Sequence, residues 1–235
     1  MATTTEKKKR TTYTTPKGES LFAHLVNVDY GTEQYPDEKG SFNVTLALDA
    51  DAAARLDDLI AHEVDAARAE AEEKFDDLKP QTRKKFGSVK FNEVGPEEYD
   101  REGNPTGRRL FRFKTGAFYE NRQGVKVQRK VPLFDSMQQP VKLSDEPGNG
   151  SVVRVAFCCA PYFVEGQGMG GLSLYLNAVQ IIRLNTFGER SASDYGFGAE
   201  EGGFTSEDAD DDATAPSGND ETVAAATEAD AVPQF

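Results

Sequence analysis

Residues 40–80 read GSFNVTLALDADAAARLDDLIAHEVDAARAEAEEKFDDLKP, and the hydrophobic period changes within this stretch. In residues 40–50, Phe42, Val44, Leu46 and Leu48 alternate with smaller or polar residues, which predicts a half-buried strand. From residue 56 to residue 78, apolar residues recur at three- and four-residue steps, which predicts one amphipathic helix. An aspartate at 49 or 51 can cap the helix, and the proline at 80 ends it.

Further strand-type segments surround this unit. One precedes it, at residues 20–31, and four follow, at residues 108–120, 125–134, 151–164 and 172–184. Residues 81–107 form a polar connection with only weak strand signals. The order β-β-α-β-β-β-β predicts a mainly β fold, namely a five- to six-stranded OB-fold barrel with one packed α-helix and disordered termini. A β-sandwich is the competing architecture.

The two ends of the chain differ from its middle in charge. Residues 1–18 hold five basic residues and one acidic residue, whereas residues 205–235 hold nine acidic residues and no Lys or Arg. We therefore predict a flexible basic arm at 1–18, an OB-fold domain at 19–187 and a disordered acidic tail at 188–235. Such asymmetry is typical of contacts with nucleic acid or protein partners. The alternative is that both ends only solubilise the protein.

Several classes of chemistry find no support. Cys158 and Cys159 are adjacent, so in a strand they point to opposite faces, and the absence of a disulfide framework is typical of a reducing, intracellular setting. His24 and His62 lack zinc-site spacing, and we expect neither a metal nor a cofactor. The GQGMGG segment at 166–171 matches a dinucleotide motif but lies between two strand segments, which favours a hairpin turn. No signal peptide or membrane span is expected.

The informative stretch is residues 101–130, with nine basic and two acidic residues in a chain of net charge -13. Strand alternation places its phenylalanines at 111 and 113 on one face and several cationic side chains on the other. A basic groove with aromatic side chains that can stack on bases suits single-stranded nucleic acid. The alternative is a basic sheet face that contacts only solvent and binds no ligand. The candidate contacts are Tyr162, Arg112, Lys114, Phe118, Tyr119, Lys126, Lys130 and Arg154.

Three segments, together with the tail, carry a family resemblance: DYGTEQYPDEKGSFNVTLAL, RLFRFKTGAFYE and APYFVEGQGMGGLSLYLNAVQIIRLNTFG. With the strand order and the helix after the second strand, they make the chain resemble the single-stranded DNA-binding proteins of short-tailed, T7-like phages. The resemblance covers most of the chain. It implies a non-catalytic OB-fold protein that serves DNA replication, recombination and repair in the cytoplasm of the infected host.

The resemblance also implies roles for individual residues. Tyr162, in APYF, falls where the family has a DNA-stacking tyrosine, and Lys114 falls on its basic strand. The family pattern has a second aromatic near position 164, where this chain has Phe163 and Val164. The platform is therefore one ring short, or Phe118 or Tyr119 supplies the ring. Those two lie on opposite faces of a regular strand, so only one of them is expected to stack.

For the tail, the resemblance implies competition with DNA and recruitment of replication proteins, namely a DNA polymerase and a helicase-primase. We expect Phe235 to offer a partner both a ring and a terminal carboxylate, while the acids mimic phosphates. The family leaves a homodimer open and implies no membrane contact. A protein-only adaptor, an RNA-binding OB protein and a metal-dependent nuclease are the alternatives. The predicted partner contacts are Phe235, Asp230, Asp210, Asp211 and Asp212.

Overall fold

The computed structural model describes residues 10–186. Residues 1–9 and the expected tail at 188–235, including Phe235 and the four aspartates predicted to bind partners, lie outside this range. Within the range, the structure has no helix with the length and apolar character needed to cross a membrane. The same residues contain no group of three or more His, Cys, Asp or Glu side chains placed to hold a metal ion.

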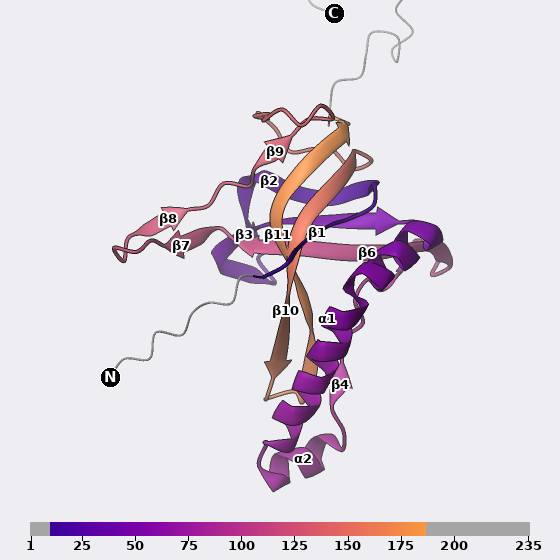
Figure 1. The fold of residues 1–235 in the computed structure, drawn as a ribbon, viewed down its shortest axis with the longest axis vertical. Coiled ribbons are helices and arrows are strands. Elements are labelled where there is room, and N and C mark those ends of the chain that lie inside the picture. Colours follow the sequence, from indigo (N-terminus) through magenta and orange to yellow (C-terminus); the bar gives the residue numbers. More distant parts are fainter. Residues whose placement is uncertain (1–9, 187–235) are drawn as a thin grey trace, which may run out of the picture. The chain divides into compact units, whose positions relative to one another are not determined.

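Five long strands form a closed barrel, in agreement with the predicted OB-fold (Figure 1). Hydrogen-bonded neighbours follow the order β10-β2-β3-β6-β11, and pairing between β10 and β11 closes the ring. The parallel pair β6–β11 joins the two halves, and the other barrel pairs are antiparallel. Closure leaves no room for the alternative two-sheet sandwich. The strands are β2 (Gly18–Gly31), β3 (Pro36–Leu48), β6 (Pro105–Gly116), β10 (Val152–Val164) and β11 (Met169–Arg183).

The predicted helix follows β3 as α1 (Ala50–Asp76). Asp49 is its N-cap and accepts a 2.7 Å hydrogen bond from the Ala52 N–H. The apolar stripe packs on the barrel, where Leu56 and Ile60 are fully buried. The helix ends before the expected proline, and Pro80 instead starts a second helix, α2 (Pro80–Phe86), which the sequence reasoning missed. Proline lacks an N–H, and the first turn of a helix does not need one, so Pro80 suits a helix start.

Two of the predicted strands, residues 108–120 and 125–134, are each interrupted. Beyond β6 the chain leaves the barrel at Ala117, which is fully buried, donates its N–H to Gly40 and accepts the N–H of Arg129. The next residues form a separate hairpin of β7 (Phe118–Glu120) and β8 (Lys126–Gln128), which projects from the barrel (Figure 1). Three more short strands are β4 (Lys90–Phe91), β5 (Glu97–Tyr99) and β9 (Leu133–Phe134).

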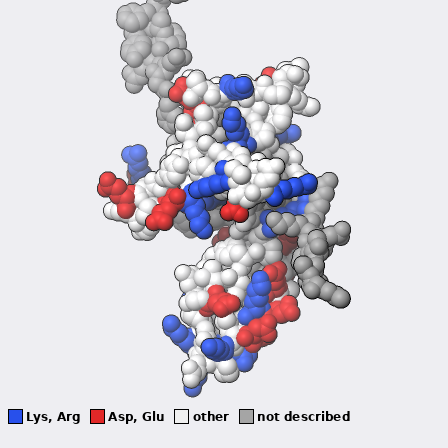
Figure 2. Space-filling view, turned by 90° about the vertical axis from the view of Figure 1, so that its left-hand side faces the viewer, with Lys and Arg blue, Asp and Glu red and all other residues white. Residues whose placement is uncertain are grey.

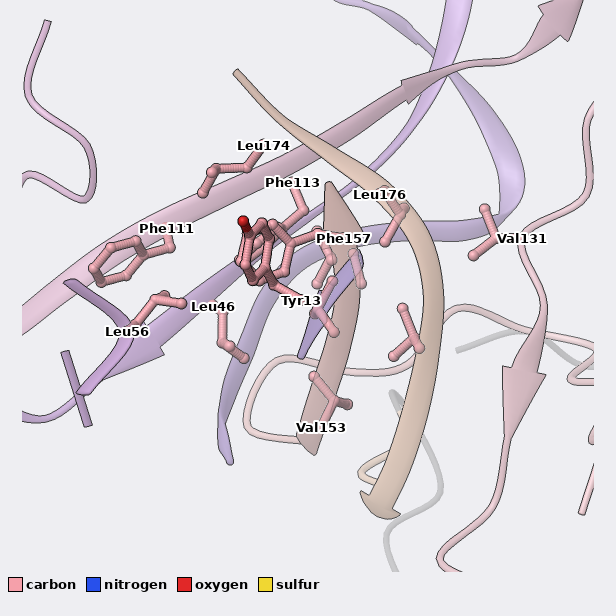
Figure 3. Packing of buried hydrophobic residues seen from close by; sticks show 14 of the residues in the cluster. Tyr13, Leu46, Leu56, Phe111, Phe113, Val131, Val153, Phe157, Leu174 and Leu176 are labelled. Atoms are coloured by element: carbon pink, nitrogen blue, oxygen red, sulfur yellow. The ribbon is translucent and has the colours of Figure 1, made fainter. Parts of the chain in front are cut away.

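The prediction of a flexible arm over residues 1–18 is wrong for its second half. Strand β1 (Thr12–Thr14) pairs with β10, and the Tyr13 ring packs against Phe157 in the core, with 5.7 Å between ring centroids (Figure 3). The Tyr13 hydroxyl donates a 2.9 Å hydrogen bond to Glu63 of α1. Burial and this bond raise the pKa of Tyr13. A single aromatic among polar residues is too short a pattern to reveal such a strand.

Candidate nucleic-acid interface

The outer side of β10 and β11 is defined by their register. Tyr162 lies opposite Gly171 and Cys158 lies opposite Tyr175, with no register shift between these two pairs. Because side chains alternate along a strand, Tyr162 and Tyr175 share one face. The intervening Leu172 and Leu174 are buried on the other face. Parallel pairing of β6 with β11 places Lys114 beside Tyr175. We call this surface the Tyr162 face; its residues are Arg112, Lys114, Tyr162, Ser173 and Tyr175.

The Tyr162 ring is oriented by two neighbours. A Cβ atom at Gly171 would lie only 2.4–2.7 Å from three atoms of the tyrosine, so the ring lies directly over this glycine. The Asn92 amide nitrogen donates a 2.5 Å hydrogen bond to the Tyr162 hydroxyl. The ring is half-buried and held in one orientation, which suits the stacking of an unpaired base.

The glycine-rich segment at 166–171 covers most of the turn between β10 and β11, at residues 165–168, and the start of β11, in agreement with the predicted hairpin. Gly168 has a φ of +60°, a backbone conformation that favours glycine. A Cβ atom at Gly170 would lie 2.4 Å from the Cβ of Ala71 on α1, so this position lets the helix approach the strand closely. The segment is therefore structural, and its Gly171 also supports the Tyr162 ring.

Two cationic side chains of β6 line a cleft next to the β2–β3 turn. Its volume is about 990 Å³, and Arg112, Lys114, Tyr35 and Asp37 are among its lining residues. Lys114 Nζ lies 2.9 Å from an Asp37 carboxylate oxygen. The hydrogen bond from Lys114 holds the pKa of Asp37 below its usual value. The half-buried Asp37 carboxylate thus pairs with the charge of Lys114.

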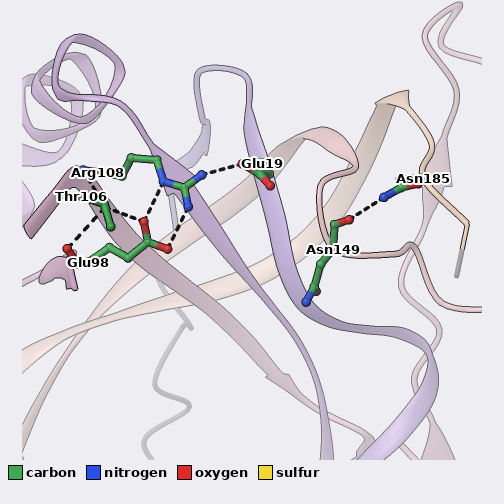
Figure 4. A network of polar contacts seen from close by, with 6 residues as sticks. All are labelled: Glu19, Glu98, Thr106, Arg108, Asn149 and Asn185. Carbon is green, nitrogen blue, oxygen red and sulfur yellow. Dashed lines mark hydrogen bonds and ion pairs between the residues drawn. The ribbon is translucent and has the colours of Figure 1, made fainter. Parts of the chain in front are cut away.

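Not all of the predicted basic stretch is free to bind a ligand. Arg108 contacts Glu98 at 2.7 Å and Glu19 at 2.6 Å, and its hydrogen bond lowers the pKa of Glu98 (Figure 4). Arg109 pairs with Asp57 of α1 and also donates to the Gly95 carbonyl. These pairs bind the wall of the barrel to α1, β2 and β5, so both arginines have structural roles.

Two of the predicted aromatics lie on the projecting hairpin, apart from the barrel strands. Lys126 Nζ lies 4.4 Å from the centroid of the Phe118 ring, and the Arg129 guanidinium lies 5.3 Å from that of Tyr119. Each ring is thus covered by a cation of the neighbouring strand or loop. Lys130 follows as an exposed residue. Figure 2, which faces the side from which the hairpin projects, shows Lys and Arg side chains gathered across the middle.

Arg154 is separated from the other predicted contacts. It lies on β10 eight residues before Tyr162, a span of roughly 26 Å in a strand. It lines a smaller cleft with Phe134 and Gln138, and its Nε has no hydrogen-bond partner among residues 10–186. The structure thus brings Tyr162, Arg112 and Lys114 onto one face and places the other candidates on the hairpin or at a distance.

Sequence reasoning missed two residues of this region. Asn92, in the polar connection, reaches the Tyr162 hydroxyl. Tyr175 is 39% exposed on the Tyr162 face. The alternation LSLYLNA contained the signal for Tyr175, because Leu172, Leu174 and Leu176 mark the buried face and leave the tyrosine on the outside. No short-range pattern could have indicated Asn92.

Comparison with known proteins gives consistent matches. Residues 18–184 match the family model described as "Single-stranded DNA-binding protein, Bacteriophage T7". The single-stranded DNA-binding protein of Enterobacteria phage T3 is 27% identical over 206 residues, which cover 84% of this chain and 86% of that protein. The crystal structure of gp2.5, a single-stranded DNA-binding protein of bacteriophage T7, superposes with a TM-score of 0.58 at 21% identity, covering 84% of this chain and all of that one.

Proposed function

This chain belongs to the family of single-stranded DNA-binding proteins typified by that of bacteriophage T7, and we propose that it binds single-stranded DNA across the Tyr162 face. The relatives are binding proteins, in agreement with the expectation that the chain is not an enzyme. The observation that carries the proposal is the oriented Tyr162 ring on one face with Arg112 and Lys114. The protein would act in the cytoplasm of the phage-infected host cell.

The proposed binding mode combines stacking with phosphate contacts. Every base has a π face, so a base stacked on Tyr162 is held largely without regard to its identity. Arg112 and Lys114 would contact phosphates of the same strand, and a phosphate would displace Asp37 from Lys114. Lys126 and Lys130 on or beside the hairpin, with Phe118 or Tyr119, would extend the basic path, and Arg154 would contact a more distant part of the DNA.

Binding is expected to depend strongly on salt. With roughly four to five phosphate contacts, the slope of log affinity against log salt should be about -3, at about 0.7 per contact for single strands. The measurement is a titration of an oligonucleotide at several salt concentrations. Replacing Arg112 and Lys114 together by glutamine should reduce the slope by about 1.4. A slope near zero for the intact protein would contradict an electrostatic path.

A matched control for this charge change is the pair Lys79→Gln and Lys84→Gln. Both lysines are exposed at or beside α2, outside the Tyr162 face, and their replacement changes the net charge by the same amount. If the control pair lowers affinity and slope as much as the Arg112 and Lys114 pair, the contacts are not localised on β6. The same titration with an RNA oligonucleotide tests the alternative of an RNA-binding protein.

We further propose that residues 188–235 form a tail that competes with DNA and recruits replication proteins. Its nine acidic residues after position 204, with no Lys or Arg, can mimic phosphates, and Asp210, Asp211 and Asp212 form the densest group. A 31-residue random coil spans about 30 Å, while a 200-residue domain has a radius of gyration of roughly 16 Å. Tethering gives such a segment a high effective concentration near the basic face.

Deletion of residues 205–235 should tighten DNA binding, on the order of tenfold at low salt, and abolish binding to the phage DNA polymerase or helicase-primase. In contrast, Phe235→Ala should leave DNA affinity unchanged, because it alters no charge, and should weaken the partner contact through loss of the ring. Replacing Asp230 should affect both functions weakly. The measurements are DNA titrations and pull-downs. If the Phe235→Ala protein retains its partners as well as the intact protein does, Phe235 is not an anchor.

A further inference from the structure

We propose that Tyr175 is a second base-stacking platform and that Arg10 binds the phosphate next to that base. This inference rests on the proposed single-stranded DNA binding and adds a subsite to it. Tyr175 is 39% exposed, while its neighbours Leu174 and Leu176 are 6% and 3% exposed on the opposite side of β11. The ring therefore lies on the solvent side of a central barrel strand, outside the core.

Two cations lie beside Tyr175, one on β6 and one just before β1. Its Cα partners are Lys114 on β6 and Cys158 on β10. From the β10 side, the guanidinium carbon of Arg10 lies 5.1 Å from the centroid of the Tyr175 ring. An exposed aromatic ring with a lysine on one side and an arginine on the other combines the two groups that a stacked nucleotide requires, a π surface and counter-charges for phosphate.

Arg10 is held near this ring by the anchored strand β1. Thr12 pairs with Cys158, which is itself the partner of Tyr175. One residue later, the buried Tyr13 is hydrogen-bonded to Glu63 at 2.9 Å and lies 3.0 Å from His62 Nε2. These contacts fix the chain two and three residues after Arg10. Arg10 therefore reaches the ring from a position two residues before a strand that is built into the sheet.

The two tyrosines lie in line along β11. The Tyr162 ring, from β10, covers Gly171 of β11. Tyr175 lies four residues after Gly171 on the same face of β11, a distance of roughly 13 Å along the strand. Arg112 and Lys114 run parallel to this line on β6. One DNA strand lying along β11 could stack one base on each ring while its phosphates meet the cations of β6. This arrangement would also supply the second ring that is missing after Tyr162 in the sequence.

Arg10 covers the face of the Tyr175 ring on which a base would stack, so DNA binding requires that Arg10 move away from the ring. A guanidinium–phosphate contact is a charge-assisted and frequently bidentate hydrogen bond, whereas an exposed cation–π contact is weaker. On binding, the base takes the ring and Arg10 moves to the adjacent phosphate. Removing Arg10 should therefore weaken DNA binding and reduce the salt slope by about 0.7, even though the ring becomes more accessible.

The test is a titration with oligo(dT) of increasing length, using the full chain. On long oligonucleotides Tyr175→Ala should bind about five- to 150-fold more weakly, the range for one stacked base, and Tyr175→Phe should bind nearly as well as the intact protein. The loss should add to that of Tyr162→Ala, because the two rings are far enough apart to act independently. Tyr99→Ala is the control, since Tyr99 is 59% exposed on β5.

The outcomes separate this inference from the proposed function. If the intact protein does not bind oligo(dT), the proposed function itself fails. If the intact protein binds and Tyr162→Ala weakens binding, but a folded Tyr175→Ala protein binds like the Tyr99→Ala control, then Tyr175 is not a platform. Tighter binding by Arg10→Ala would overturn the phosphate role of Arg10. Thermal melting of each variant establishes that it is folded.

Discussion

Replacement of Tyr162 by alanine is expected to weaken single-stranded DNA binding by about 1–3 kcal/mol, or roughly five- to 150-fold. The ring is positioned over Gly171 and tied through its hydroxyl to Asn92. Its orientation is therefore set before DNA arrives, and little rotamer freedom remains to be lost on binding. An oligonucleotide titration at fixed salt measures the effect, because the tyrosine carries no charge and the salt slope should stay the same.

Two further variants separate stacking from other roles of Tyr162. Tyr162→Phe keeps the ring and loses only the hydrogen bond to Asn92, so most of the affinity should remain. Gly171→Ala keeps the tyrosine but puts a methyl group where the ring now lies, so it should weaken binding nearly as much as Tyr162→Ala. Gly166→Ala is the matched control, because a Cβ atom there meets nothing within 4 Å.

A folded Tyr162→Ala protein that binds DNA as tightly as the intact chain would remove Tyr162 from the binding face. The same conclusion would follow if Gly171→Ala and Gly166→Ala had equal affinities. A lower melting temperature of Tyr162→Ala without a change in affinity would identify the ring as a packing element of the β10–β11 hairpin. Melting curves recorded with each titration distinguish these cases.

The barrel and its long helix could be predicted because their patterns are local. The change from period two to period 3.6 near residue 50 separates β3 from α1, and five alternating segments correspond to the five barrel strands. Interruptions of the pattern were harder to predict. Ala117 is an apolar residue in phase with Phe111 and Phe113, so nothing in the sequence indicates that the chain leaves the barrel there.

The candidate site was predictable only in part. Alternation alone placed Arg112 and Lys114 on the outside of β6, because Phe111 and Phe113 mark the buried face. Alternation could not tell which cations are already paired. The partner of Lys114, Asp37, lies 77 residues away in the sequence, and that of Arg109, Asp57, lies 52 residues away. Such pairings depend on the barrel register, which is a long-range property of the fold.

Glu146, in the loop before β10, has a role in stability that the sequence did not predict. Between His24 and Asp29 the pairing of β2 with β3 is irregular. The backbone N–H groups of Leu25, Val26 and Asn27 instead donate to the Glu146 carboxylate, at distances from 2.6 to 3.1 Å. One side chain thus replaces a strand as the acceptor for three consecutive residues of the barrel.

Replacement of Glu146 by alanine should therefore lower the free energy of unfolding by about 2–4 kcal/mol, because it leaves three N–H groups, two of them partly buried, without their charged acceptor. For a domain of this size, that loss corresponds to about 5–15 °C in melting temperature. Glu146→Gln should be intermediate, since its amide keeps one accepting oxygen but turns an NH₂ group toward backbone donors.

The exposed neighbour Asp145 provides the control, as Asp145→Ala removes the same charge from the same loop. If Glu146→Ala melts within about 1 °C of Asp145→Ala, water satisfies the three donors and the carboxylate does not hold β2. Below the melting range, DNA affinity should be unchanged in all three variants, because Glu146 is not part of the Tyr162 face.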